Sequence, residues 1–167
     1  MAKLGIDDII RGVAYAYDKN VSHEPTNAER RHNRLQGYCM ARDKRDFGSD
    51  ASGVYGGVGW TMKRPKGTYW CGYISFPRDL PDDCLMALDR EVHGGFTGDP
   101  KDETMGFDCN HGFIGDWPAD RWTGTYRDYH YVLGQIKNLI EISEQWTNPK
   151  LAAILGGEEE KEEKSEA

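Results

Sequence analysis

The middle of the chain constrains the fold most narrowly, because strand-forming residues alternate there with chain breakers. Residues 54–62 (VYGGVGWTM) combine glycines with β-branched and aromatic side chains, and residues 68–76 (TYWCGYISF) are typical of a second strand. Pro65-Lys66-Gly67 separates the two segments, and Pro77 and Pro81 close the second. The chain holds 20 glycines, so it turns often and an all-helical bundle is disfavoured.

Helical patterns lie on both sides of these strands. Residues 5–18 and 126–146 repeat apolar side chains at helical spacing and predict an N-terminal and a C-terminal helix. We also expect a polar helix over 27–36, capped by Asn27, and a short helix over 82–90.

Two more short strands are expected at 91–97 and 104–111, joined by a polar loop at hairpin-like spacing. The predicted fold class is α+β: a small antiparallel sheet from about 54 to 111, packed by an N-terminal and a C-terminal helix. Aromatic side chains should supply most of the core: Trp60, Trp70, Tyr73, Phe76, Phe96 and Phe107.

Length and charge bound the domain count and the partners. A chain of 167 residues suits one domain, expected over 1–155, followed by a disordered acidic tail over 156–167. The net charge of −7 disfavours nucleic acid as a partner. No apolar run reaches the ~20 residues that a membrane helix needs, and the start lacks a signal-peptide pattern. We therefore expect a cytosolic protein without a membrane partner.

One stretch of this acidic chain is basic. It includes six cationic side chains: Arg30, Arg31, Arg34, Arg42, Lys44 and Arg45. Such a run is usually a solvated face that balances acidic neighbours. The alternative is a patch that binds a phosphorylated ligand.

The four cysteines carry little chemistry. Cys39, Cys71, Cys84 and Cys109 are widely spaced and form no C-x-x-C pair, so free thiols are expected and a cysteine-rich zinc site is not. Cys109 has His111 two residues away, but it alternates with Phe107, which indicates a small buried side chain rather than a nucleophile.

The candidate site combines residues from the two short strands. Its members are His93, Gly94, Gly95, Thr97, Asp108, Asn110, His111 and Asp116. Two histidines and an aspartate suit a transition metal, the same groups suit a polar ligand such as a sugar or nucleotide, and structural hydrogen bonding remains a third reading. In a regular strand Asp108 meets His93, and His111 joins them only if the chain bends near Gly112.

These motifs, in their order, resemble a known protein group. Val92-His93-Gly94-Gly95-x-Thr97, Gly106-Phe107-Asp108-Cys109-x-His111, Gly115-Asp116 and Tyr126-Arg127-Asp128-x-x-Tyr131-Val132, after Trp70 and Gly72-Tyr73-Ile74, resemble a family of small uncharacterised bacteriophage proteins. The resemblance covers roughly residues 68–145. Here Gly112-Phe113-Ile114 separate the histidine from Gly-Asp, which could displace Asp116, and Gln135 replaces a usual Glu.

The resemblance implies a phage protein that is made in the host bacterial cytoplasm. We expect an accessory protein that counteracts a bacterial defence system by binding, either sequestering a nucleotide-like signal or inhibiting a defence protein. A host defence protein or a small phosphorylated ligand is the expected partner. The alternatives are a metal-dependent hydrolase with His93, Asp108 and His111 as ligands and Asp116 or Glu91 as base, or a virion component. The sequence leaves cofactors, bound metal and homo-oligomer formation open.

Overall fold

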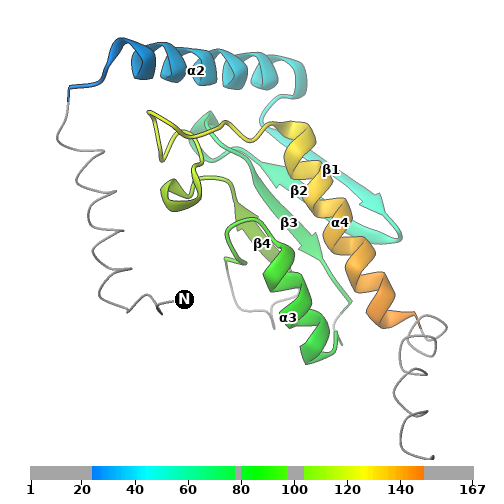
Figure 1. Ribbon diagram of the computed structural model, residues 1–167. Helices are drawn as coiled ribbons and strands as arrows, with labels where there is room; N and C mark the ends of the chain where they lie inside the picture. Colours follow the sequence, from blue (N-terminus) through cyan, green and yellow to red (C-terminus); the bar gives the residue numbers. More distant parts are fainter. Residues whose placement is uncertain (1–23, 78–79, 98–103, 149–167) are drawn as a thin grey trace, which may run out of the picture.

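A computed structural model describes residues 24–77, 80–97 and 104–148. Four antiparallel strands form one sheet in chain order: β1 (Asp50–Tyr55), β2 (Val58–Lys63), β3 (Cys71–Ser75) and β4 (Met105–Asp108). Helix α4 (Tyr129–Thr147) packs on β2 and β3, with α3 (Asp82–Glu91) beside it. Helix α2 (Asn27–Phe47) lies across one end of the sheet (Figure 1). The predicted α+β class is confirmed.

The first two strands form a hairpin, and its turn lies in the glycine-rich segment 54–62. Tyr55 pairs with Val58 across a turn at Gly56 and Gly57, whose φ angles are 53° and 79°. A two-residue turn with positive φ at both positions matches the twist of the flanking strands, and two glycines adopt it without strain. The glycine pair therefore reverses the chain within this segment.

The core lies between the sheet and α4. Helix α4 contributes four fully buried apolar residues: Val132, Ile136, Leu139 and Ile140. The strands contribute three more: Met62, Ile74 and Phe107. Of the six aromatic residues expected there, Trp70, Phe76 and Phe107 are buried, and Trp60 and Phe96 pack at its margin.

Tyr73 is the exception among the expected core aromatics. Side chains alternate along β3, so Tyr73 faces away from the layer that holds Ile74. Its ring instead covers Gly106 of β4, where an added Cβ would lie within 3 Å of two ring atoms.

Two helices differ from their predicted forms. Helix α2 extends to Phe47, and its cap is Thr26 rather than Asn27: the Thr26 hydroxyl accepts a hydrogen bond from the Glu29 amide, and the Glu29 carboxylate accepts one from the Thr26 amide. This reciprocal capping box satisfies two amides at the helix start. Helix α4 begins after Asp128, which caps it through the amide of Tyr131. None of the described helices has the length and apolar character needed to cross a membrane.

The segment after α3 is a turn rather than the expected strand. The helix predicted over 82–90 is present as α3, but Gly94 and Gly95 then adopt φ angles of 73° and 88°. Of the strand expected over 91–97 only one antiparallel bridge remains, between Thr97 and Gly106. The partner strand predicted over 104–111 is shortened to β4. The helix predicted over 5–18 and the tail over 156–167 lie outside the described residues.

A buried ion pair fastens α2 to the end of the sheet. Asp43, 7% exposed, pairs with Arg64, whose side chain is fully buried. The Asp43 carboxylate also accepts hydrogen bonds from Trp70 Nε1 at 2.9 Å, from the Tyr126 hydroxyl at 2.8 Å and from the Tyr129 amide at 3.2 Å. We call these five residues the Asp43 centre. It joins α2 to β2, to β3 and to the start of α4.

Candidate functional site

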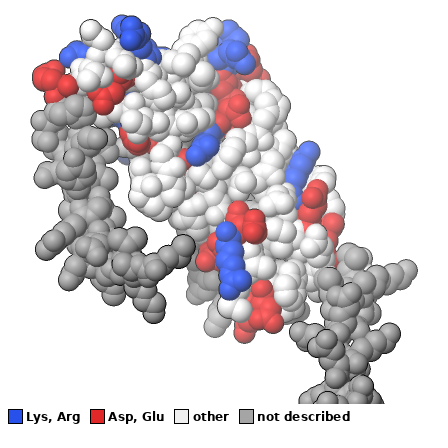
Figure 2. All heavy atoms as spheres, viewed as in Figure 1, with Lys and Arg blue, Asp and Glu red and all other residues white. Residues whose placement is uncertain are grey.

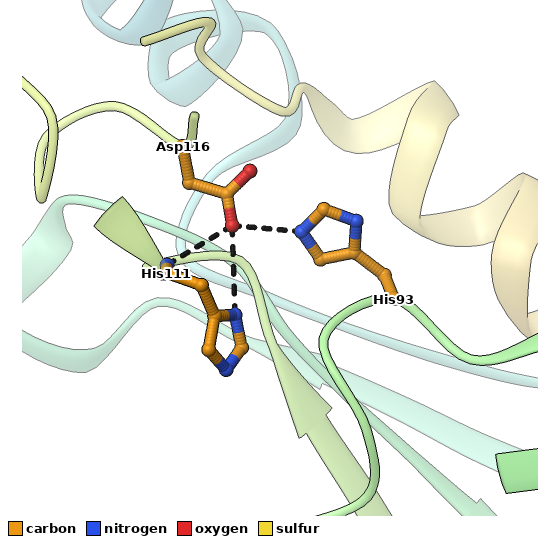
Figure 3. Close-up of side chains that lie close together, drawn as sticks. All are labelled: His93, His111 and Asp116. Carbon is orange, nitrogen blue, oxygen red and sulfur yellow. Dashed lines mark hydrogen bonds and ion pairs between the residues drawn. The ribbon is translucent and has the colours of Figure 1, made fainter. Parts of the chain in front are cut away.

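Three polar side chains from separate segments meet beside the sheet (Figure 3). His93 comes from the turn after α3, His111 from the end of β4 and Asp116 from the loop before α4. His93 Nε2 lies 2.7 Å from Asp116 Oδ2, and His111 Nδ1 lies 3.5 Å from the same oxygen. Together with the two residues that contact them, Arg127 and Tyr131, they form what we call the Asp116 centre.

A short turn brings Asp116 back to His111. Gly112–Ile114 form a single 3-10 turn, and Gly115 ends it in the left-handed conformation with φ 77°. The Asp116 amide then donates to the His111 carbonyl at 3.1 Å, while the His111 amide donates to Asp116 Oδ2 at 3.0 Å. The three inserted residues therefore do not displace Asp116, because they form the turn that places it. His111 joins the cluster because β4 ends at Asp108 and strand alternation stops there.

Gly94 makes room for His111. A Cβ on Gly94 would lie within 3 Å of three atoms of the His111 ring. The space that a side chain at Gly94 would occupy is filled by the imidazole. At Gly95 an added Cβ would meet nothing within 4 Å.

Asp116 is fully buried, and its carboxylate is held by donors on both oxygens. Oδ2 faces His93 and the His111 amide, and Oδ1 accepts from Arg127 Nε at 3.0 Å. Burial alone raises the pKa of this carboxyl, but the hydrogen bonds from His93, the His111 amide and Arg127 outweigh it, so the net pKa is lowered. Asp116 is therefore a carboxylate at neutral pH.

The second nitrogen of His93 contacts Tyr131. The Tyr131 hydroxyl lies 2.9 Å from His93 Nδ1, and the His93 side chain is only 6% exposed. In neutral His93 the Nε2–H donates to Asp116 and the tyrosine hydroxyl donates to Nδ1. If a metal ion replaces the proton on Nε2, the neutral ring carries its proton on Nδ1. The tyrosine hydroxyl then accepts a hydrogen bond from Nδ1–H. Tyr131 can therefore stabilise both forms of the ring.

His111 Nδ1 has no hydrogen-bond partner although it is buried. Its nearest acceptors are Asp116 Oδ2 at 3.5 Å and Asp108 Oδ1 at 3.8 Å. The side-chain carbonyl of Asn110, the preceding residue, is also buried without a partner. Unsatisfied buried polar atoms are uncommon in folded proteins because each loses its hydration energy. Two adjacent ones indicate an incomplete polar site.

The other predicted site residues lie at the margin. The expected contact between His93 and Asp108 is not formed, since Asp116 takes that place. Asp108 accepts from the Asn110 amide at 3.0 Å and is 27% exposed. Thr97 is exposed, and its hydroxyl donates to the Gly106 carbonyl at 3.1 Å.

Arg127 and Tyr131 carried no predicted role. Arg127 directly precedes the Asp128 cap and Tyr131 lies in the first turn of α4, so both flank the start of this helix, and their spacing alone does not reveal the cluster. The Arg127 guanidinium also stacks over the Tyr131 ring at 4.9 Å.

Cys109 is buried, as expected, and is not suited to nucleophilic attack. Burial, together with the nearby carboxylates of Asp116 and Asp108, raises the pKa of its thiol well above the ordinary value. Among the described residues all four cysteines are free, and only Cys39 is exposed.

A separate cavity of about 440 Å³ lies beside the Asp43 centre, between α2 and the start of α4, where Cys39, Arg42, Phe47 and His130 contribute to its wall. Its buried carboxylate, Asp43, is saturated by donors from the protein itself. The Asp116 centre is therefore the stronger candidate for chemistry.

The donor set of the Asp116 centre fits a transition metal. One nitrogen from each histidine and one carboxylate oxygen all lie within 4.8 Å of one another. Two imidazoles and a carboxylate are a known ligand set for Zn²⁺ and Fe²⁺ that leaves coordination positions open. Comparisons of the chain with protein families, with curated proteins and with solved structures found no significant match. The assignment of function therefore depends on this geometry.

Proposed function

We propose that this protein is a metal-dependent hydrolase in which His93 Nε2, His111 Nδ1 and Asp116 Oδ2 hold one divalent transition ion. One observation carries the proposal: the buried, unpartnered Nδ1 of His111 is directed at the same carboxylate oxygen that His93 contacts. A metal ion bonded to this nitrogen would satisfy it. A bound ion would supply Lewis acidity at the open side of the cluster.

The distances support this ligand set. Metal bonds to nitrogen and oxygen of about 2.0–2.2 Å place tetrahedral ligand atoms about 3.3 Å apart. Asp116 Oδ2 lies 2.7 Å from one histidine nitrogen and 3.5 Å from the other. Both distances lie within about 0.6 Å of that spacing, and the two histidine nitrogens lie within 4.8 Å of each other. The proton between His93 and Asp116 is the group that the ion replaces.

The outer contacts also match a metal centre. Ligand histidines usually donate their second ring N–H to a neighbour, and ligand carboxylates are themselves hydrogen-bonded. Tyr131 lies on His93 Nδ1 and would accept from it once an ion is bound at Nε2, and Arg127 donates to Asp116. Both contacts fix ring and carboxylate orientation before an ion arrives.

Asp108 is the carboxylate placed to act as general base. It lies next to His111, and its side chain is partly exposed, whereas Glu91, the base considered from sequence, ends α3 on the surface. In hydrolysis a water oxygen bonds to the electrophilic atom of the substrate, its proton passes to Asp108, and the bond to the leaving group breaks. Asp116 is the proposed ligand and is not free for this role.

Sequestration is the second candidate function. Asp116 is fully buried and His93 is nearly so, which leaves little room for substrate at those two atoms and favours binding without turnover. In either case we propose that the protein is a phage-encoded accessory protein of the host cytoplasm that counteracts a bacterial defence system. It would remove a nucleotide-like signal by cleaving or by holding it, or inhibit a defence protein directly.

Metal binding is tested on the full chain, stripped with chelator and titrated with Zn²⁺, Mn²⁺ and Co²⁺ by calorimetry, with metal content measured after dialysis. We expect one ion per chain. His93→Ala, His111→Ala and Asp116→Asn should each weaken binding by more than the roughly 10- to 100-fold typical of losing an outer contact. His130→Ala, an exposed histidine of α4 outside the centre, is the matched control. Equal metal content in all four variants would overturn the proposal.

Turnover is tested separately from metal binding. Metal-loaded protein is incubated with a chromogenic phosphodiester and, separately, with a set of nucleotides. The nucleotides are recovered after denaturation, and their masses are measured by mass spectrometry. We expect cleaved products, and Asp108→Asn should abolish cleavage while metal content stays at one ion. Intact nucleotide released from the protein would instead support sequestration. Metal binding with neither cleavage nor captured nucleotide would leave inhibition of a defence protein as the function.

A further inference from the structure

One exposed face of α2 carries three residues of the basic run, and the last of them, Arg42, also borders the cavity beside the Asp43 centre. Arg31, Arg34, Leu35, Tyr38 and Arg42 follow the spacing of a single helix face, and we call them the α2 stripe. All five are exposed, Leu35 by 57% and Tyr38 by 65%. Basic side chains lie at both ends of this helix along the top of the molecule in Figure 2.

The opposite face of α2 fixes the direction of the stripe. His32 lies 2.7 Å from the Gly124 carbonyl, Asn33 accepts from the Trp117 indole at 2.8 Å, and Gln36 accepts from the Tyr126 amide at 2.8 Å. Together with the Asp43 centre, these bonds hold the inner face along most of the helix length. The stripe is therefore presented to solvent by a fixed scaffold.

The arginines of the stripe form no ion pair in the part of the chain that the structure describes, although the charge of Arg42 acts on the nearby Asp46 carboxylate. Arg30 pairs with Glu24 at 3.2 Å and Arg45 pairs with Asp46 at 2.9 Å, but no ion pair involves Arg31, Arg34 or Arg42. Three guanidinium groups on one face thus remain available to an anionic ligand.

The net negative charge of the whole chain hides a local excess of positive charge on α2. Residues 158–167 hold six glutamates and two lysines, so they contribute −4 to the net −7 of the chain. Helix α2 alone has six basic and three acidic residues. The expectation that nucleic acid is disfavoured used the average over the whole chain, whereas binding depends on the field at the contact surface.

We infer that the α2 stripe binds single-stranded nucleic acid, with Arg31, Arg34 and Arg42 on backbone phosphates and Tyr38 stacked on a base. Guanidinium groups match phosphate oxygens with two parallel hydrogen bonds, and an exposed aromatic ring between them is a stacking platform for an unpaired base. The stripe from residue 31 to 42 is about 16 Å long at the helical rise, enough to follow several phosphates.

A protein partner fits the same surface less well. Its apolar part consists of Leu35 and Tyr38 alone, whereas a standard protein interface buries roughly 800 Å² on each side around an apolar centre. Charge dominates this face. The inference is independent of the metal centre, because it uses none of its residues.

Fluorescence anisotropy with a labelled mixed-sequence 20-nucleotide DNA strand, and with its duplex, tests the inference on the full chain between 25 and 200 mM salt. For three phosphate contacts on a single strand the slope of log K against log salt should be about −2, and each Arg→Gln change in the stripe should reduce it by about 0.7. Tyr38→Ala should weaken binding roughly 5- to 100-fold and leave the slope unchanged.

Arg30→Gln and Arg45→Gln are the matched controls, because these arginines of the same helix are already paired. Both should bind like the unmodified chain, and all variants are checked for helix content by circular dichroism. Absence of binding at 25 mM salt would overturn the inference. Binding that survives the triple change of Arg31, Arg34 and Arg42 would also overturn it, and tighter binding of the duplex would refute the role of Tyr38 in stacking.

Discussion

Two buried aspartates, Asp43 and Asp116, differ in the groups that surround their carboxylates. Asp43 and Asp116 are both nearly or fully removed from solvent, and each pairs with an arginine. At Asp43 the arginine, Arg64, is fully buried and the other donors are an indole, a phenol and a backbone amide. At Asp116 the arginine, Arg127, is 25% exposed and two of the neighbours are imidazoles.

The two sets of neighbours differ in whether they can release a proton or bind a metal ion near neutral pH. The donors around Asp43 keep their protons at neutral pH, and they satisfy the carboxylate without leaving a gap. Imidazoles give up a proton or accept a metal near neutrality, and one of those at Asp116 has an unpartnered nitrogen. A saturated buried charge therefore fixes the fold, while an incompletely satisfied one marks the place where chemistry is possible.

The largest effect is expected from removing the Asp43 carboxylate. Asp43→Ala leaves the Arg64 guanidinium buried without a counter-charge, and breaking such a pair costs about 3–5 kcal/mol. Urea unfolding followed by tryptophan fluorescence measures this loss in the free energy of unfolding. Arg45→Ala, which breaks the exposed pair with Asp46, should leave the midpoint unchanged. Equal midpoints for the two variants would contradict a structural role for the Asp43 centre.

Asp116→Ala should cost less, about 1–3 kcal/mol. The side chain of Arg127 is partly exposed, so it can be hydrated once its partner is gone, which the buried Arg64 cannot. The same urea experiment gives the free energy of unfolding, and the calorimetric titration gives metal affinity, which should be lost. A destabilisation as large as that of Asp43→Ala would show that both centres are primarily structural.

Gly94→Ala and Gly95→Ala separate backbone strain from the space that His111 requires. Both positions have positive φ, so each substitution should cost about 1–2 kcal/mol through strain alone. Only at Gly94 does the new Cβ collide with the His111 ring. We therefore expect an additional loss of stability and a loss of metal affinity for Gly94→Ala, with near-normal affinity for Gly95→Ala. Identical affinities would refute the placement of His111.

The smallest effect concerns the thiols near the two centres. Cys39 lines the cavity beside the Asp43 centre and is exposed, so it should react with a disulfide reagent at pH 8 within minutes. Burial raises the pKa of Cys71 to about 11, so only about one such thiol in a thousand is ionised at that pH. One fast thiol per chain is expected, and Cys39→Ser should remove it. Fast reaction of Cys109 would mean that the Asp116 centre opens readily.

Sequence patterns predicted the architecture better than the site. Apolar periodicity placed α4 within a few residues, because burial on one face leaves a regular trace in the chain, and the short helix expected over 82–90 matches α3. The candidate residues included His93, His111 and Asp116. However, the prediction paired His93 with Asp108 instead of Asp116. That pairing assumed strand alternation as far as His111, whereas β4 ends at Asp108.

Long-range polar contacts left no such trace. Asp43 lies beyond the helix expected over 27–36, and nothing near it in the chain indicated Arg64 or Tyr126, which lie 21 and 83 positions away. The turn that returns Asp116 to His111 depends on the φ of Gly115, which spacing alone does not reveal. Such contacts are fixed by tertiary packing, which has no periodic signature.

The attachment of α2 has a consequence for how the molecule opens. Only Asp43 of its 21 residues is buried, so this helix is held mainly by polar bonds, together with the stacking of Phe47 on Tyr129, while α4 buries five residues. Elements with little buried surface detach at a lower free energy than the whole molecule unfolds. Amide hydrogens of α2 should therefore exchange with solvent faster than those of α4, as a separate cooperative unit. The helix that carries the basic stripe can then come loose while the Asp116 centre, to which it contributes no residue, stays assembled.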